Sequence, residues 1–167
     1  MKTDAPKTTA SFPSLAGRKV ALIAADFYPQ LSEQLLDGAR RGAAACGIEP
    51  EDITEVRVPG CFELPVAAIR LLRRDDFDAI VALGVVVRGD TPHFDYVAGE
   101  CARGLMNVQM STGVPVGFGV LTTQTLAQAE ERADPARLDK GFEAAVAALT
   151  VLNISTDPIA KAIGFRR

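Results

Sequence analysis

Short apolar runs alternate along the chain with longer stretches in which apolar residues recur every three or four positions. A short apolar run bounded by turn residues is typical of a strand buried on both faces, and the wider spacing is typical of a helix with one buried side. Four segments have the strand pattern, at residues 19–25, 53–58, 79–87 and 115–121. Segment 79–87, AIVALGVVV, is the most apolar, so we expect it at the centre of a sheet.

Helical spacing fills the intervals between these strands and the stretch after the last one. Proline suits the first turn of a helix, glycine suits the residue after its end, and Thr followed three positions later by Gln forms a capping box. Together these signals predict five helices, namely Pro29 to near Gly47, a helix containing Pro65 that runs to about Arg74, the region of His93–Tyr96 to about Met110, a helix capped by Thr125 and Gln128, and an amphipathic helix across Phe142–Leu152.

The alternation of strands and helices indicates βαβ units with right-handed crossovers. We therefore expect an α/β fold with a four-stranded parallel sheet that is covered by helices on both faces. Residues 1–16 are rich in Thr, Lys, Ser and Pro and are expected to form an N-terminal arm, with residues 17–167 as a single domain.

Composition narrows the class of protein. The apolar share of 48% is enough for a substantial core, and the net charge of −3 argues against a nucleic-acid-binding face. The three cysteines, Cys46, Cys61 and Cys101, are far apart and with one histidine do not make a usual zinc site, and their odd number suggests a reducing compartment. The chain opens without an apolar leader, and its longest apolar run is too short to span a bilayer. We expect a soluble, cytoplasmic protein without nucleic-acid or membrane partners.

The candidate functional residues lie just after the carboxyl ends of the predicted strands, where the ligands of open parallel sheets bind. Four polar and aromatic segments follow the predicted strands: DFYP, PGCFE, RGDTPHFD and TTQT. The third holds His93, the only histidine, just after Gly89, Asp90 and Thr91. A helix start after a glycine has free amides that suit an anion, and an imidazole can give and take a proton near neutral pH. His93 is therefore either a proton-transfer residue or a helix-start residue that faces water.

The remaining candidates each have a structural alternative. Phe27 and Phe62 could stack on a planar ring or close the core, and Glu63 could bind hydroxyl groups or serve as a first-turn carboxylate favoured by the helix dipole. Cys61 is expected to be a small buried filler rather than a nucleophile. Arg132 could bind a phosphate with two hydrogen bonds or belong to a solvated polar face. The chain has no GxGxxG or GxxxxGK[ST] phosphate loop.

Three longer motifs, VPGCFELP, ALGVVVRGDTPHFDYV and TGVPVGFGVLTT, with the ER of AEERAD, resemble the lumazine synthase family over residues 17–153. The resemblance implies a flavodoxin-like three-layer α/β/α sandwich that assembles as pentamers, sometimes as twelve pentamers in an icosahedral shell. It also implies a transferase of riboflavin biosynthesis. This enzyme condenses 5-amino-6-(D-ribitylamino)uracil with 3,4-dihydroxy-2-butanone 4-phosphate and releases 6,7-dimethyl-8-ribityllumazine, inorganic phosphate and water, without a metal or organic cofactor.

The same resemblance implies roles for particular residues. They are Phe27 stacking on the pyrimidine, Cys61, Phe62 and Glu63 lining the ribityl pocket, Val86 and Val87 contacting the pyrimidine, Gly89, Asp90, Thr91 and Arg132 binding the phosphate, His93 transferring protons, and Phe118 and Lys140 coming with Arg132 from the neighbouring subunit.

Three positions depart from the family pattern. Tyr28 stands where Asn is common, Cys61 where Ala or Ser is usual, and DPARLDKG, Asp134 to Gly141, replaces a loop often written GTKAGNKG. In the family this loop influences whether pentamers close into a shell, so its change bears on assembly more than on activity. A non-catalytic paralogue that binds a lumazine or flavin is the main alternative. A flavodoxin-like FMN module and an enzyme that joins two lumazines into riboflavin are further alternatives.

Overall fold

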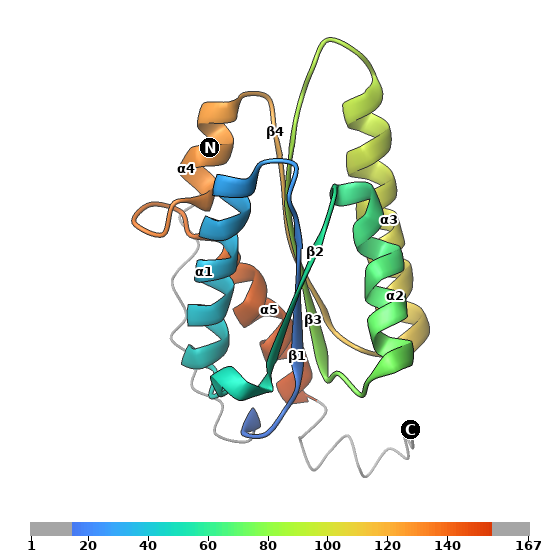
Figure 1. Cartoon of the computed structure of the whole chain (residues 1–167), viewed down its shortest axis with the longest axis vertical. Helices are drawn as coiled ribbons and strands as arrows, with labels where there is room; N and C mark the ends of the chain where they lie inside the picture. Colours follow the sequence, from blue (N-terminus) through green and yellow to red (C-terminus); the bar gives the residue numbers. More distant parts are fainter. Residues whose placement is uncertain (1–14, 155–167) are drawn as a thin grey trace.

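Four parallel strands form the middle layer of the molecule, in the order β2-β1-β3-β4 (Figure 1). The computed structural model describes residues 15–154. The strands are β1 (Val20–Ala25), β2 (Ile53–Val58), β3 (Ala79–Val87) and β4 (Val116–Thr123). All four predicted strands are confirmed. The predicted arm, residues 1–16, lies outside the described residues except for its last two, of which Leu15 is fully buried in the core.

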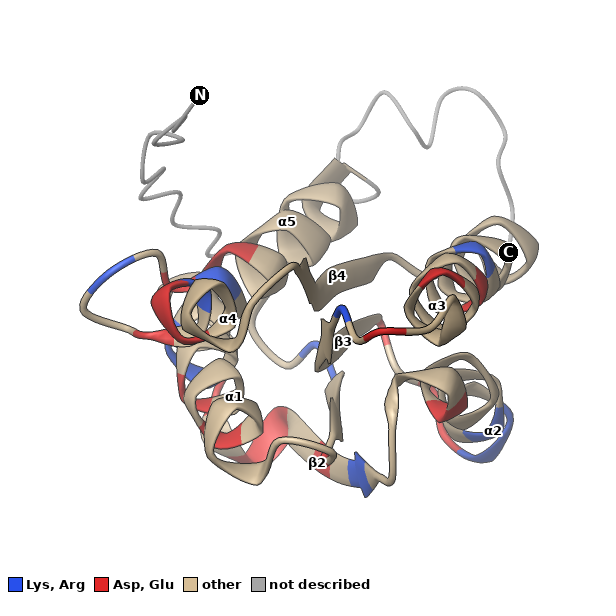
Figure 2. Ribbon diagram, turned by 90° about the horizontal axis from the view of Figure 1, so that it is seen from above, with Lys and Arg blue, Asp and Glu red and all other residues tan. Residues whose placement is uncertain are grey.

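Helices cover both faces of the sheet, which confirms the three-layer α/β/α architecture (Figures 1 and 2). The apolar side chains of α1, α4 and α5 pack on one face, and those of α2 and α3 pack on the other. The helices are α1 (Pro29–Ala45), α2 (Leu64–Arg74), α3 (His93–Thr112), α4 (Leu126–Ala133) and α5 (Lys140–Ile154), with short 3-10 helices at Pro50–Asp52 and Cys61–Glu63.

β3 is a central strand, as its composition predicts, and β1 shares the centre with it. All six residues of β1 and the first seven of β3 are buried, because each strand has a neighbour on both sides. The register sets a step between them. Ala24 of β1 pairs with Leu83, so β3 continues to Val87 beyond the end of β1. This step leaves room above β1 for the chemistry described below.

Helix ends follow the predicted signals. α1 ends at Ala45, and Gly47 has a φ of 89°, the left-handed conformation that glycine adopts without cost. At α4 the Thr125 hydroxyl accepts a hydrogen bond from the Gln128 amide (3.3 Å), while the Gln128 side chain accepts one from the amide of Gln124 (2.9 Å). The capping box is thus present, except that the Gln128 side chain binds the amide of Gln124 instead of the amide of Thr125.

α5 differs from its predicted amphipathic pattern. It buries Ala145, Leu149 and Leu152 against α1 and the sheet, yet Val151 and Ile154 are 49% and 64% exposed. Its apolar residues therefore extend beyond the face that this chain covers. None of the helices described in residues 15–154 has the length and apolar content that a bilayer crossing requires.

Candidate active site

A cavity of about 640 Å³ lies at the carboxyl ends of β1, β2 and β3. The step between β1 and β3 opens it, because the last residues of β3 rise beside the turn that follows β1. Three of the segments predicted to carry chemistry form its walls. The lining residues are Phe27, Tyr28, Pro59, Gly60, Cys61, Phe62, Glu63, Val85, Val86, Val87, Gly89, Thr91, His93, Phe94, Tyr96 and Val97.

Exposed aromatic rings surround this cavity. Phe27 is 71% exposed, Phe62 59% and Tyr96 69%. The interpretation of Phe27 and Phe62 as core residues is therefore wrong, and large apolar side chains that stay in solvent around a concave surface favour a ligand site. The Phe27 ring meets Tyr28 edge to face, with centroids 5.2 Å apart, which leaves a face of Phe27 for another planar ring.

Cys61 is a buried filler, as expected. It is 4% exposed, and its Sγ lies 3.8 Å from the Val85 carbonyl oxygen. Burial raises the pKa of the Cys61 thiol to about 11, so the side chain is neutral at physiological pH and supplies no nucleophile. Gly84 of β3 makes the room for it, because a Cβ on Gly84 would lie 2.5 Å from this sulfur.

Glu63 ends the 3-10 helix at the rim of the cavity, where it is half-buried. Its amide donates a hydrogen bond to the Gly60 carbonyl oxygen (3.3 Å), and this bond fixes the tight turn after β2. Within residues 15–154 its carboxylate accepts no hydrogen bond. The carboxylate can therefore accept hydrogen bonds from the hydroxyl groups of a ligand.

His93 is the first residue of α3, is exposed, and shares the cavity wall with Gly89 and Thr91. Both predicted interpretations, proton transfer and a helix-start residue that faces water, need an exposed imidazole, and this one is exposed at the cavity wall. No side chain caps the start of α3, so its first amides can bind an anion. Asp90 is exposed but does not line the cavity.

Arg88 holds the residues that follow His93. Its guanidinium forms two hydrogen bonds to the Asp95 carboxylate (2.6 and 3.2 Å), and its Cζ lies 4.2 Å from the centroid of the Phe94 ring. The paired Arg88 lowers the pKa of the Asp95 carboxyl. The first turn of α3, and the backbone of His93 with it, is thereby tied to the end of β3.

The other predicted residues line a second hollow, a groove of about 560 Å³ between β4 and α5. Phe118, 46% exposed on the edge strand, lies in it with Arg132 and Lys140. Arg132 donates a hydrogen bond to the Gln128 carbonyl oxygen (3.0 Å) and, among the described residues, forms no ion pair, so it can bind an anion. Lys140 lies 2.5 Å from a carboxylate oxygen of Glu143. No residue lines both hollows.

Apart from Asp90, which lines neither hollow, the predicted residues fall into two groups, one with His93 and one with Arg132 and Lys140. Sequence reasoning missed Tyr96 and Val97 in the first group, although they stand three and four residues after His93, the spacing that puts side chains on one side of a helix. It also missed Glu143, which has the same spacing from Lys140. The described residues contain no cluster of three or more His, Cys, Asp or Glu side chains that could hold a metal ion.

Comparison with known proteins shows the family of this chain. The sequence model of the 6,7-dimethyl-8-ribityllumazine synthase family matches residues 17–156. Proteins named 6,7-dimethyl-8-ribityllumazine synthase are similar over most of their length. The one from Kineococcus radiotolerans is 54% identical (80% of this chain, 83% of the relative). Those from Nitratidesulfovibrio vulgaris and Aquifex aeolicus are 46% and 45% identical, each over 83% of this chain and over 88% and 90% of the relative.

Proposed function

The chain belongs to the 6,7-dimethyl-8-ribityllumazine synthase family, and we propose that its active site joins the His93 cavity of one subunit to the β4 groove of a neighbouring subunit. The chain is a transferase of riboflavin biosynthesis. It condenses 5-amino-6-(D-ribitylamino)uracil with 3,4-dihydroxy-2-butanone 4-phosphate to 6,7-dimethyl-8-ribityllumazine, the penultimate step of the pathway.

One observation carries the proposed site. The residues with roles in proton transfer and ring stacking line one hollow, and the cations suited to a phosphate line another. A single chain therefore holds two incomplete halves of a site. The groove also exposes Phe118 on an edge strand, and α5 beside it exposes Val151, as expected of a face that another copy covers. A homo-oligomer with closed symmetry, such as a pentamer, would complete every site in the same way.

The cavity suits the pyrimidine substrate. Phe27 offers a ring face for stacking on the pyrimidine, and the backbone of Val86 and Val87 follows the rim where the ring would lie. Glu63 accepts hydrogen bonds from the ribityl chain, with Cys61 and Phe62 as apolar walls. A buried hydroxyl without a partner costs on the order of 1–3 kcal/mol, so this carboxylate supports both affinity and orientation.

The second substrate lies between the two halves. Its phosphate is bound by Arg132 and Lys140 of the neighbour and by the free amides at the start of α3, near Gly89 and Thr91. Asp90, exposed beside them, contributes through its backbone. This arrangement holds the ketone next to the amine of the pyrimidine, and correct placement of two reactants can supply roughly 7–11 kcal/mol of a barrier.

His93 transfers the protons. The amine attacks the ketone, water leaves to give an imine, phosphate is eliminated, and the ring closes with loss of a further water. Each of these steps moves a proton to or from nitrogen, carbon or oxygen, and an exposed imidazole at the cavity wall can exchange it. Release of the phosphate is favoured by the cations that bind it. All parts of the reaction are supplied by side chains and backbone amides.

We also propose that the assembly is a pentamer or a set of pentamers and that the protein is cytoplasmic. The exposed apolar residues of β4 and α5 support self-association. The three cysteines are buried and unpaired, which suits a reducing compartment. The loop Asp134 to Gly141 carries the departure from the family pattern, so the number of pentamers in the assembly is set separately from activity.

One assay tests these proposals: formation of the fluorescent lumazine from both substrates by the purified chain and by two variants. We expect His93→Ala to slow turnover by on the order of 10²-fold or more and Lys140→Ala to weaken binding of the phosphorylated ketone. Subunits of the two variants are then dissociated, mixed equally and reassembled. Roughly a quarter of the sites should combine an intact cavity with an intact groove, so activity should return.

Each failure has its own meaning. Absence of product with the folded wild-type chain would reject the activity and favour a binding paralogue. Full activity of His93→Ala would reject its role in proton transfer. Mixed variants that stay as slow as the separate ones would reject a site shared between subunits.

A further inference from the structure

The two residues that flank Lys140, Asp139 and Gly141, both contact α1, which is far from them in sequence. Lys140 is the first residue of α5 and lines the groove with Arg132. On one side of it stands Asp139, whose side chain is 9% exposed. On the other stands Gly141, where a Cβ would lie 2.1 Å from the carbonyl oxygen of Leu35 in α1. The backbone around Lys140 is thus pressed against α1.

Asp139 is bound by a two-bonded ion pair. The Arg41 guanidinium donates hydrogen bonds to both of its carboxylate oxygens (2.8 and 3.0 Å), across 98 residues of sequence. Asp139 has a φ of 48° and is the only non-glycine residue in the left-handed region among those described. Its amide donates to the Asp134 carbonyl oxygen (3.1 Å), and its own carbonyl accepts from the Glu143 amide (3.2 Å). The residue therefore closes the α4–α5 loop and starts α5.

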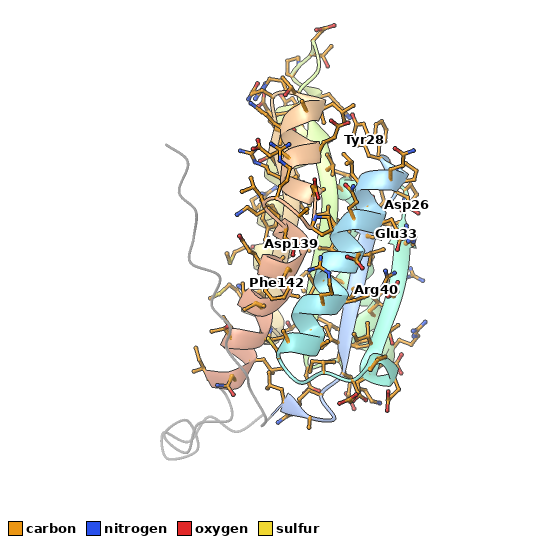
Figure 3. The ribbon with its side chains drawn as sticks, turned by 90° about the vertical axis from the view of Figure 1, so that its left-hand side faces the viewer. Asp26, Tyr28, Glu33, Arg40, Asp139 and Phe142 are labelled. Carbon is orange, nitrogen blue, oxygen red and sulfur yellow. The ribbon has the colours of Figure 1, made fainter. Side chains whose placement is uncertain are left out.

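The neighbouring arginine provides a contrast. Arg40, next to Arg41 in α1, also forms a two-bonded pair, but with Glu55 of β2 (2.6 and 2.8 Å), and it binds Glu33 as well (2.9 Å). Figure 3 shows Arg40 and Glu33 on the side of α1 toward β2, whereas Asp139 and Phe142 lie on its α5 side. Two arginines of similar chemistry thus serve different faces of one helix, and only Arg41 reaches the segment that carries Lys140.

We propose that Arg41 is a positioning residue for phosphate binding: through Asp139 it fixes where α5 begins and so where the Lys140 ammonium stands. This inference rests on the proposed phosphate role of Lys140. Without Arg41, a nearly buried carboxylate has lost its cation, and it turns toward water together with its left-handed backbone. The loop from Asp134 then shifts, and Lys140 leaves the position from which it meets the phosphate.

Kinetics of Arg41 and Asp139 variants test this role, with both Michaelis constants measured on the assembled protein. We expect Arg41→Met to raise KM for the phosphorylated ketone by about tenfold, equivalent to ~1.4 kcal/mol, and to leave KM for the pyrimidine unchanged. Inhibition by inorganic phosphate should weaken by a similar factor. Asp139→Asn, which keeps a residue that tolerates positive φ, should have little effect alone. In Arg41→Met with Asp139→Asn no buried charge is left, so most of the phosphate affinity should return.

Arg40→Met is the matched control and should leave both Michaelis constants as they are. Lys140→Ala separates the inference from its premise. If Lys140→Ala leaves the ketone KM unchanged, the proposed role of Lys140 is wrong. If Lys140→Ala raises it while Arg41→Met changes neither KM, or both equally, the positioning role is wrong. Should Arg41→Met not fold, Arg41→Lys keeps the charge without the two-pronged geometry and must still raise the ketone KM selectively for the inference to stand.

Discussion

Gly84→Ala tests whether the floor of the active-site cavity is packed as the structure describes it. Gly84 lies within β3, beneath the start of the segment that carries His93. An added Cβ would stand 2.5 Å from the Cys61 Sγ, 3.0 Å from the Ala25 Cβ and 3.7 Å from a Leu64 methyl. Ordinary contacts between such atoms are about 3.5–4.0 Å, so the sulfur has to move by an ångström or more. It is already wedged against Val85.

The magnitude follows from that overlap. Overpacking a filled core costs about 1–3 kcal/mol, and we expect Gly84→Ala to destabilise the fold by this amount. Cys61→Ala removes one buried atom, which costs about 0.5–1.5 kcal/mol, as for a methyl group. In the double variant the new methyl occupies the space that the sulfur left. The two changes should therefore compensate, with a coupling of about 1–3 kcal/mol.

Urea unfolding at one fixed protein concentration measures this cycle, since the stability of an oligomer depends on concentration. Gly99→Ala is the matched control, because nothing lies within 4 Å of its added carbon. An exposed helical glycine replaced by alanine should gain about 0.5–1 kcal/mol. If Gly84→Ala loses the same free energy with and without Cys61, the thiol turns aside without cost, and the described packing of the cavity floor is refuted.

Two further predictions concern the loop before α3 and the buried thiols. Gly89 has open space around its Cα, so Gly89→Ala should leave the unfolding midpoint unchanged but raise KM for the phosphorylated ketone; an unchanged KM would remove this loop from the phosphate site. Burial raises the pKa of Cys61 to about 11 and of Cys101 to about 12, from 9.0 for a free thiol. The two protonated thiols contribute fully to the free energy of unfolding below pH 9. This contribution falls as the pH rises toward 11, by about 1.4 kcal/mol per pH unit for each thiol, because the thiols of the unfolded chain lose their protons first. Cys101→Ala should make that fall shallower, and an identical slope would contradict the described burial.

The strands and most helix ends could be predicted from the sequence because their signals are local. Segments 53–58 and 79–87 match β2 and β3 residue for residue, since each apolar run is bounded by turn residues. The cavity could be predicted in outline for the same reason: three strand-end segments in a parallel sheet meet at one edge.

What could not be predicted depends on distant parts of the chain meeting. The pair of Arg41 and Asp139 spans 98 residues, and no pattern in either segment indicates the other. The separation of Arg132 and Lys140 from the His93 cavity follows from β4 being an edge strand, a matter of strand order that apolar runs do not encode. The exposed apolar side of α5 has a similar cause. Helical spacing shows which residues are apolar but not how many faces one chain covers.

The buried cysteines allow slow opening of the structure to be followed by thiol labelling. Cys46 lies in the layer of α1 and α5, while Cys61 and Cys101 lie on the opposite side of the sheet. Cys46 and Cys101 are fully buried, so a thiol reagent reacts with either one only when its helix layer separates from the sheet, whereas Cys61 lines the cavity. The order in which Cys46 and Cys101 gain mass would show which layer separates first. The enzyme thus has a native thiol on each face of its sheet, and the labelling rate of each thiol reports how often that face opens.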